Sequence, residues 1–144
     1  MRPTVSAAQL RVVVAVFAVL FILVVASGWV PGWYTMHGTE RRLFGLFMMS
    51  ALDDITHGVS ALALAAAALR GRESELRLVC TALGWYYALD ALFFLLYGFV
   101  NEKPWPADLA LNAPHVAISV VLLTLAYAPR AAAAPARAPI AVAQ

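Results

Sequence analysis

Four long apolar segments constrain this chain more than any other feature. They cover residues 10–30, 43–69, 78–100 and 109–128. An α-helix rises about 1.5 Å per residue and needs about 20 residues to cross the hydrocarbon layer of a bilayer. Each segment is therefore long enough to form a transmembrane helix.

The composition agrees with a membrane protein. Hydrophobic residues make up 63% of the 144 residues and charged residues only 12%, which is about half the charged fraction of a soluble domain. We therefore predict an all-α fold, a four-transmembrane-helix bundle that forms one domain over residues 1–130, with the lipid bilayer as its surroundings. Residues 131–144, rich in alanine and proline, are predicted to be a disordered cytoplasmic tail.

The basic residues predict the orientation of this bundle. Seven arginines fall on the side that holds both termini and the turn at residues 70–77, and three basic residues fall on the other side. The positive-inside rule then places the N and C termini in the cytoplasm. Nine of the ten basic residues are arginine and alanine is abundant, a composition typical of GC-rich bacterial genomes, so we predict a multi-pass protein of the bacterial inner membrane.

Other features exclude several classes of protein. The net charge of +2 follows from the loop bias and gives no reason to expect nucleic acid binding. The first apolar run, about 19 residues, exceeds the core of 7–15 residues of a signal peptide, so we expect it to be retained. The single cysteine, Cys80, forms no intrachain disulfide or cysteine zinc site and is predicted to be a packing residue.

Two matched features predict an internal duplication. The first and third segments end alike, in Gly28–Trp33 and in Gly98–Val100 followed by Pro104–Pro106. The second and fourth segments each carry an acid or amide three residues before a histidine. These matches predict two tandem helical hairpins, parallel repeats related by an axis along the membrane normal. The first outer loop is longer by Tyr34–Arg42, for which a surface helix and an extended loop both remain open.

Polar residues at helical spacing predict a site inside the bundle. An aspartate at a helix centre costs about 2.5–3.5 kcal/mol even on the lenient insertion scale, so such groups should point inward and pair. The intramembrane polar cluster is predicted to comprise Asp53, Asp54, His57, Asp90, Asn112 and His115, with support from Ser50, Tyr87 and Ser119.

Within the cluster, either aspartate of the pair at 53 and 54 lies at the spacing needed to reach His57. Two adjacent carboxylates should not both ionise inside a membrane, so one of Asp53 and Asp54 is expected to be protonated. Tyr87 is placed to donate a hydrogen bond to Asp90.

The duplication adds a prediction about the two histidines. His57 and His115 lie at nearly equal depth, so a pseudo-twofold axis would let them face one another across the bundle. Asn112 belongs to the cluster or, alternatively, caps a fourth helix that begins near it. The first helix carries only Ser27 as a polar side chain near its outer end and is predicted to be a wall of the bundle.

The function remains open among several interpretations. The leading one is an integral membrane protein in which the cluster is structural, fixing helix register or binding a partner. A second is proton or cation handling through the same residues. A third is haem or divalent metal binding by His57 and His115. The sequence carries no phosphate loop, nucleophile elbow or metalloprotease motif that would favour an enzyme, and His37 is expected to be solvated. A homodimer or a larger membrane partner would help to bury the cluster.

The stretch 43–57 resembles the second helix of the domain of unknown function 4383 family, a set of small bacterial four-helix membrane proteins. Members typically carry Gly-Leu-Phe, matched here by Gly45-Leu46-Phe47, then a serine and a His-Asn-x-x-His run. An Asn-x-x-His element of the fourth helix is matched by Asn112-x-x-His115. The resemblance covers roughly residues 10–128 and implies a four-helix membrane fold with no established activity.

The chain departs from the family pattern beside the histidines. Asp53 and Asp54 stand where the family has His and Asn, and Ala61 and Ser119 replace glycines. The missing histidine puts any metal role implied by the family in doubt, and the two aspartates make the site more acidic.

Overall fold

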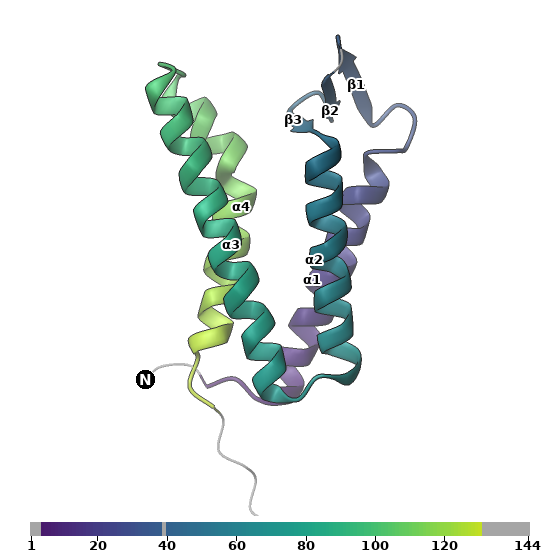
Figure 1. Cartoon of the computed structure of the whole chain (residues 1–144), viewed down its shortest axis with the longest axis vertical. Coiled ribbons are helices and arrows are strands. Elements are labelled where there is room, and N and C mark those ends of the chain that lie inside the picture. The colour runs from purple at the N-terminus through teal and green to yellow at the C-terminus, as the bar shows by residue number, and fades with distance from the viewer. Residues whose placement is uncertain (1–3, 39, 131–144) are drawn as a thin grey trace, which may run out of the picture.

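A computed structural model describes residues 4–38 and 40–130 of the chain. It contains four long helices, α1 (Ala7–Ser27), α2 (Ala51–Arg70), α3 (Glu73–Val100) and α4 (Trp105–Tyr127), shown in Figure 1. All four are long and apolar enough to cross a membrane. The prediction of an all-α fold with four apolar helices is confirmed, and the predicted tail at 131–144 lies outside the described residues.

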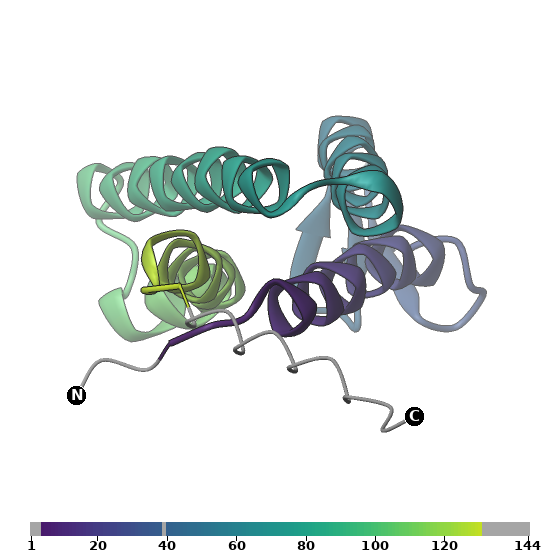
Figure 2. The same cartoon turned by 90° about the horizontal axis from the view of Figure 1, so that it is seen from below.

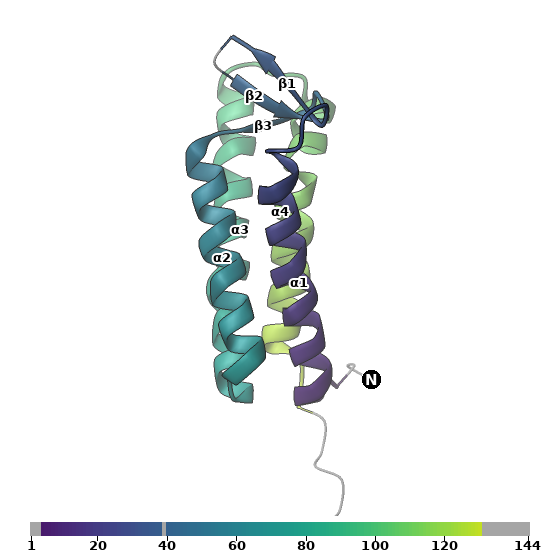
Figure 3. The same ribbon diagram turned by 90° about the vertical axis from the view of Figure 1, so that its right-hand side faces the viewer.

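The helices are arranged as two antiparallel pairs. Figures 1 and 3 show α1 beside α2 and α3 beside α4, with both chain ends leaving from the same end of the molecule. We call this the termini end and the opposite one the sheet end. Seen from the termini end, in Figure 2, the first pair lies on one side and the second pair on the other. The pairs come together at the termini end and diverge toward the sheet end (Figure 1).

A small sheet replaces the start of the predicted second helix. Strands β1 (Tyr34–His37), β2 (Glu40–Leu43) and β3 (Phe47–Met49) form an antiparallel sheet in the order β1-β2-β3. The predicted helix start at residue 43 is therefore wrong. The turn between β2 and β3 places Phe44 and Gly45 at φ values of 52° and 72°, a left-handed conformation that a helix does not continue through. The longer first outer loop is extended.

Helix α2 begins where its sequence offers a capping box. Ser50 Oγ accepts a hydrogen bond from the Asp53 amide at 3.2 Å, and the Asp53 carboxylate accepts one from the Ser50 amide at 2.7 Å. These bonds satisfy backbone N–H groups that have no partner inside the first turn. Both residues therefore lie at the sheet end and not at the centre of the helix.

The fourth helix begins four residues earlier than predicted, at Trp105. Pro104 is its N-cap residue and Pro106 lies in its first turn, where a missing backbone N–H costs no helical hydrogen bond. As a result Asn112 lies inside α4, so the alternative that it caps this helix is wrong. Asp108, expected before the helix, becomes a buried residue of its first turns.

The half of the bundle near the termini end is closed by apolar side chains. The fully buried ones, contributed by all four helices and here called the apolar plug, are Leu10, Val14, Leu64, Leu76, Cys80 and Leu122. Their spacing of four residues on α1 and on α3 is that of one helix face. Cys80 packs in this layer as predicted. Most other large apolar side chains are exposed on the outside of the helices, where a bilayer would cover them.

Each hairpin is closed by an arginine from its first helix. Arg11 of α1 donates to the carbonyl oxygens of Ala68 and Gly71 at 2.5 and 2.7 Å. These carbonyls belong to the last turn of α2 and the residue after it, and the last four carbonyls of a helix have no partner within the helix. Arg11 therefore caps the end of the neighbouring helix.

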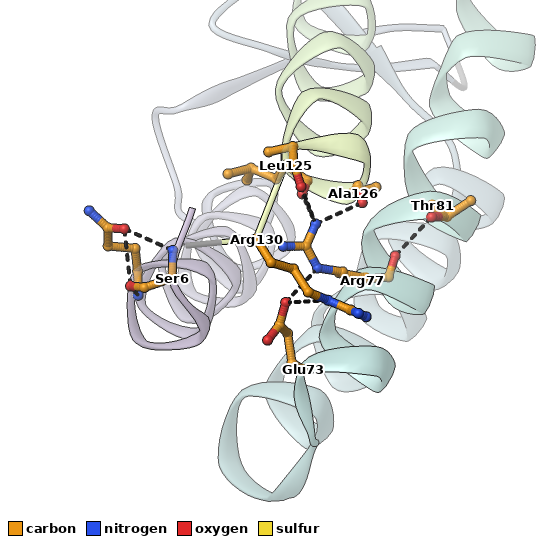
Figure 4. A network of polar contacts seen from close by, with 9 residues as sticks. Ser6, Glu73, Arg77, Thr81, Leu125, Ala126 and Arg130 are labelled. Carbon is orange, nitrogen blue, oxygen red and sulfur yellow. Dashed lines mark hydrogen bonds and ion pairs between the residues drawn. The ribbon is translucent and has the colours of Figure 1, made fainter. Parts of the chain in front are cut away.

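Arg77 of α3 makes the corresponding contacts at the end of α4. Its Nη1 donates to the carbonyl oxygens of Leu125, Ala126 and Ala128 at 3.2, 3.0 and 2.7 Å, as Figure 4 shows in part. Its Nε donates to Glu73, at 2.9 Å. The charged donor thus satisfies three carbonyls at once and holds α3 and α4 in register.

Candidate functional site

Four rings, one from each helix, meet near the middle of the bundle. Phe21 and Tyr87 stack with ring centroids 5.3 Å apart, and His57 and His115 face one another at 6.2 Å. Tyr87 also lies 5.4 Å from His115. We call these four residues the ring cluster. The predicted approach of His57 and His115 is confirmed.

Helix α1 contributes a ring to the centre of the bundle, although it was predicted to be only a wall. Phe21 contacts both His57, at 5.5 Å between ring centroids, and Tyr87. Sequence reasoning missed it because a phenylalanine in an apolar run carries no polar signal. The clue that was available is positional, since Phe21 and Tyr87 each lie ten residues after an arginine, Arg11 and Arg77.

The acid of the site is Asp90. Its Oδ2 lies 2.7 Å from Nδ1 of His115, and the side chains are 24% and 25% exposed, respectively. A carboxylate beside an imidazole can form an ion pair or share one proton, and either form offsets most of the cost of placing these groups in an apolar layer. The structure therefore brings together two of the predicted residues from α3 and α4.

His57 is held from its own helix. Its Nδ1 lies 2.7 Å from the carbonyl oxygen of Asp53. A carbonyl only accepts hydrogen bonds, so Nδ1 carries a proton and the neutral ring keeps Nε2 as its acceptor. Tyr87 donates to Ser60 Oγ at 3.2 Å, which corrects the expected hydrogen bond from Tyr87 to Asp90. This bond joins α3 to α2 and hence one hairpin to the other.

The carboxylates of Asp53 and Asp54 take part in other contacts than those predicted. Asp53 binds the cap residue Ser50, and Asp54 pairs with Arg41 of β2. The guanidinium of Arg41 also lies over the Trp29 ring, 4.9 Å from its centroid. Because α2 begins at Ala51, both acids fall in its first turn, where free N–H groups attract carboxylates. One of the two was expected to be protonated because both carboxylates were predicted to lie together inside the membrane. The structure places them in separate contacts.

The Arg41 contact gives a testable expectation for the sheet. Replacing Arg41 by glutamine leaves the half-buried Asp54 carboxylate without its partner and removes the contact with Trp29. We expect a loss of about 1–2 kcal/mol in the free energy of unfolding, measured by denaturant titration in detergent. The double variant Arg41→Gln with Asp54→Asn should recover part of that loss, and an equal loss in both variants would contradict the pairing.

The remaining polar residues line one face of α4. Asn112 is buried and donates from Nδ2 to the Asp108 carbonyl oxygen at 2.9 Å, while Ser119 Oγ donates to the Val116 carbonyl at 2.9 Å. Neither side chain is bonded to the ring cluster by these contacts. Asn112 and Ser119 nevertheless share the helix face of His115, as their spacing predicted.

Asp108 is a buried acid that sequence reasoning did not single out. It is 5% exposed, and within the described residues its Oδ2 has no hydrogen-bond partner. Its carboxylate lies where a Cβ of Gly98 would otherwise project. The available signal was its spacing, because Asp108, Asn112 and His115 fall at i, i+4 and i+7.

No family model, curated protein or solved structure matches this chain. The interpretation of the site therefore depends on its own chemistry.

Metal binding by the two histidines finds limited support in the geometry. Within residues 4–38 and 40–130, no group of three or more His, Cys, Asp or Glu side chains converges as a metal site would require. Tyr87 lies beside both imidazoles, with ring centroids 6.1 Å from His57 and 5.4 Å from His115, and Phe21 lies 5.5 Å from His57. The groups that do meet are one carboxylate and one imidazole, Asp90 and His115, at ion-pair distance.

Proposed function

We propose that this chain is a multi-pass membrane protein whose ring cluster, together with Asp90, binds and releases protons. The observation that carries the proposal is the 2.7 Å contact between Asp90 and His115, beside a second histidine in mid-helix. Ionisable residues at membrane depth are expensive, and chains of aspartate and histidine are common proton carriers there.

The proposed setting is the bacterial inner membrane, with the termini end in the cytoplasm. Four apolar helices of sufficient length support the crossing, and the arginine bias supports the orientation. The sheet then lies on the outer side. Exposed apolar residues in the turns at this end, among them Trp29, Phe44 and Leu46, suit the headgroup layer.

The proposal includes two tandem hairpins that are parallel repeats. Support comes from equivalent positions: Arg11 and Arg77 each lie four residues after the first residue of their helices and each cap the paired helix. Phe21 stacks on Tyr87, which holds the same position in α3. His57 likewise faces His115, as repeats related by a twofold axis require.

Membership of the domain of unknown function 4383 family is part of the same proposal. The retained family positions His57 and His115 both belong to the ring cluster, which supports it. The aspartates that depart from the family pattern, Asp53 and Asp54, form the cap and the ion pair at the sheet end.

The proposed chemistry is an exchange of one proton within an acid and imidazole pair. A proton taken up by His115 forms an N–H bond and an imidazolium that the Asp90 carboxylate stabilises, and its release restores the neutral ring. His57, 6.2 Å away between ring centroids, would repel His115 if both rings were charged. The cluster is therefore expected to hold one added proton more readily than two.

Infrared difference spectroscopy of protein in nanodiscs tests this proposal. The carboxylate band that Asp90→Asn removes should shift as the pH is lowered and His115 takes up a proton. His115→Gln should abolish that change, whereas His37→Gln, which alters an exposed histidine of β1, should leave it intact. Identical pH curves for the wild type and His115→Gln would contradict proton binding by the pair.

A second candidate function is structural, because the cluster joins the two hairpins. Tyr87 of α3 donates to Ser60 of α2, and the two histidines meet across the same boundary. Under this interpretation, the cluster fixes how the hairpins pack and its protonation has no further role. A pH-independent Asp90 band in a stably folded protein would favour it.

A further inference from the structure

We infer that the ring cluster exchanges protons with the sheet end alone, through Asp108 and Asn112, and that the apolar plug closes it toward the termini end. This inference rests on the proposed function. It assigns the outer compartment as the source of protons and Asp108 as the first acid that receives them.

The plug supplies the barrier. Leu64 and Leu122 each lie seven residues beyond the histidine of their helix, toward the termini end, and both are fully buried. Seven residues of helix correspond to about 10 Å. Leu10, Val14, Leu76 and Cys80 complete this layer from α1 and α3 without exposure. These side chains carry no strong hydrogen-bonding group. The last hydroxyls before them, those of Ser60 and Ser119, are engaged by Tyr87 and by the Val116 carbonyl oxygen.

The opposite half of α4 carries buried polar groups. Asp108 and Asn112 are 5% and 6% exposed and lie on the helix face of His115, between it and the sheet end. A buried carboxylate oxygen without a partner is costly unless it receives a proton or a cation. The hairpins also diverge at this end (Figure 1). The structure thus provides buried proton acceptors on the side of the ring cluster that faces the sheet end.

The groups that face His115 determine which of them stabilises the proton that it accepts. These groups are Asp90 and Tyr87 from α3 and His57 from α2, with the ring of Phe21 from α1 next to them. On α2, Asp53 holds His57 through its carbonyl oxygen. Asp90 is the carboxylate in contact with the imidazole, and it stabilises the proton that His115 accepts.

The transfer proceeds in two steps with water as carrier. A hydronium ion at the sheet end gives its proton to Asp108, forming an O–H bond and leaving water. Asp108 then passes a proton through water bound at the Asn112 amide to His115, about 10 Å away along α4, and returns to the carboxylate.

The test uses the full chain in liposomes with a single orientation. The Asp90 infrared band is followed after a pH jump on either side of the membrane. We expect a response from the sheet side that is at least about tenfold faster than from the termini side, a difference of about 1.4 kcal/mol in barrier. Asp108→Asn should slow the sheet-side response by a similar factor. Glu102→Gln removes an exposed carboxylate at the same end of the second hairpin and should change nothing.

A gain-of-function variant makes the test independent of Asp108. Leu122→Asn places a hydrogen-bonding group in the plug and should speed the termini-side response. Equal rates from both sides in the wild type, or an unchanged sheet-side rate in a folded Asp108→Asn protein, would overturn the inference while proton binding itself stands. A band that responds from neither side would overturn both proposals.

Discussion

Replacing Arg77 by leucine is expected to destabilise the protein by about 3–5 kcal/mol. The guanidinium donates to three carbonyls at the end of α4, and hydrogen bonds from charged donors each contribute about 1.5–3 kcal/mol. Without Arg77 the carbonyl oxygens of Leu125, Ala126 and Ala128 lose this partner. The free energy of unfolding, from denaturant titration in detergent followed by helical circular dichroism, measures the loss.

The control for this variant is Arg70→Leu, which removes an exposed arginine from the last turn of α2 and is expected to change stability by less than about 0.5 kcal/mol. Arg77→Lys should fall between the two, because one ammonium reaches fewer carbonyls than a planar guanidinium. If Arg77→Leu were no more destabilising than the control, the cap on α4 would contribute nothing to the fold. Arg11→Leu should repeat the effect at the end of α2, at smaller size, since it caps two carbonyls.

The second large effect is expected at the Asp90 and His115 pair. His115→Leu leaves the Asp90 carboxylate without its partner in an apolar layer and should cost about 3–5 kcal/mol. The double variant Asp90→Leu with His115→Leu removes both groups. It should be nearly as stable as the wild type or more stable, because well-packed apolar residues often replace a buried ion pair without loss.

A double-mutant cycle measured in the same detergent supplies this comparison. Additive losses would mean that the pair does not interact, and the proposed proton site would lose its basis. The Tyr87→Phe variant is the matched control, because it keeps the ring stack on Phe21 and deletes only the bond to Ser60. Its expected cost is about 1 kcal/mol.

The sequence predicted the number and type of helices because membrane-length apolar runs leave few alternatives. The backbone must satisfy its own hydrogen bonds in lipid, so such runs become helices. The helix ends were harder to predict from the sequence. Apolar residues continue from Leu43 through Met49, and nothing in their hydropathy reveals that Phe44 and Gly45 adopt a left-handed turn and that the helix begins only at the capping box of Ser50.

The start of α2 also determined which of the predicted site residues lie together. His57 and His115 lie 13 and 12 residues before the last residues of α2 and α4, so their distance from the termini end does not depend on where these helices begin. The structure brings them together with Asp90. Asp53 and Asp54 were predicted to join them on the assumption of a helix that starts at 43. A start at Ala51 leaves both acids in the first turn, where the capping box and Arg41 engage them.

What the sequence determined by itself is therefore the set of four apolar helices and the depth of the two histidines, since both depend on chain-local length and spacing. Tertiary structure alone decided the partners. Whether Asp90 meets His115, whether Phe21 enters the cluster and whether Arg77 reaches the end of α4 depend on how helices rotate about their axes when they pack. Rotation is set by contacts between residues far apart in the chain, which no single helix period specifies.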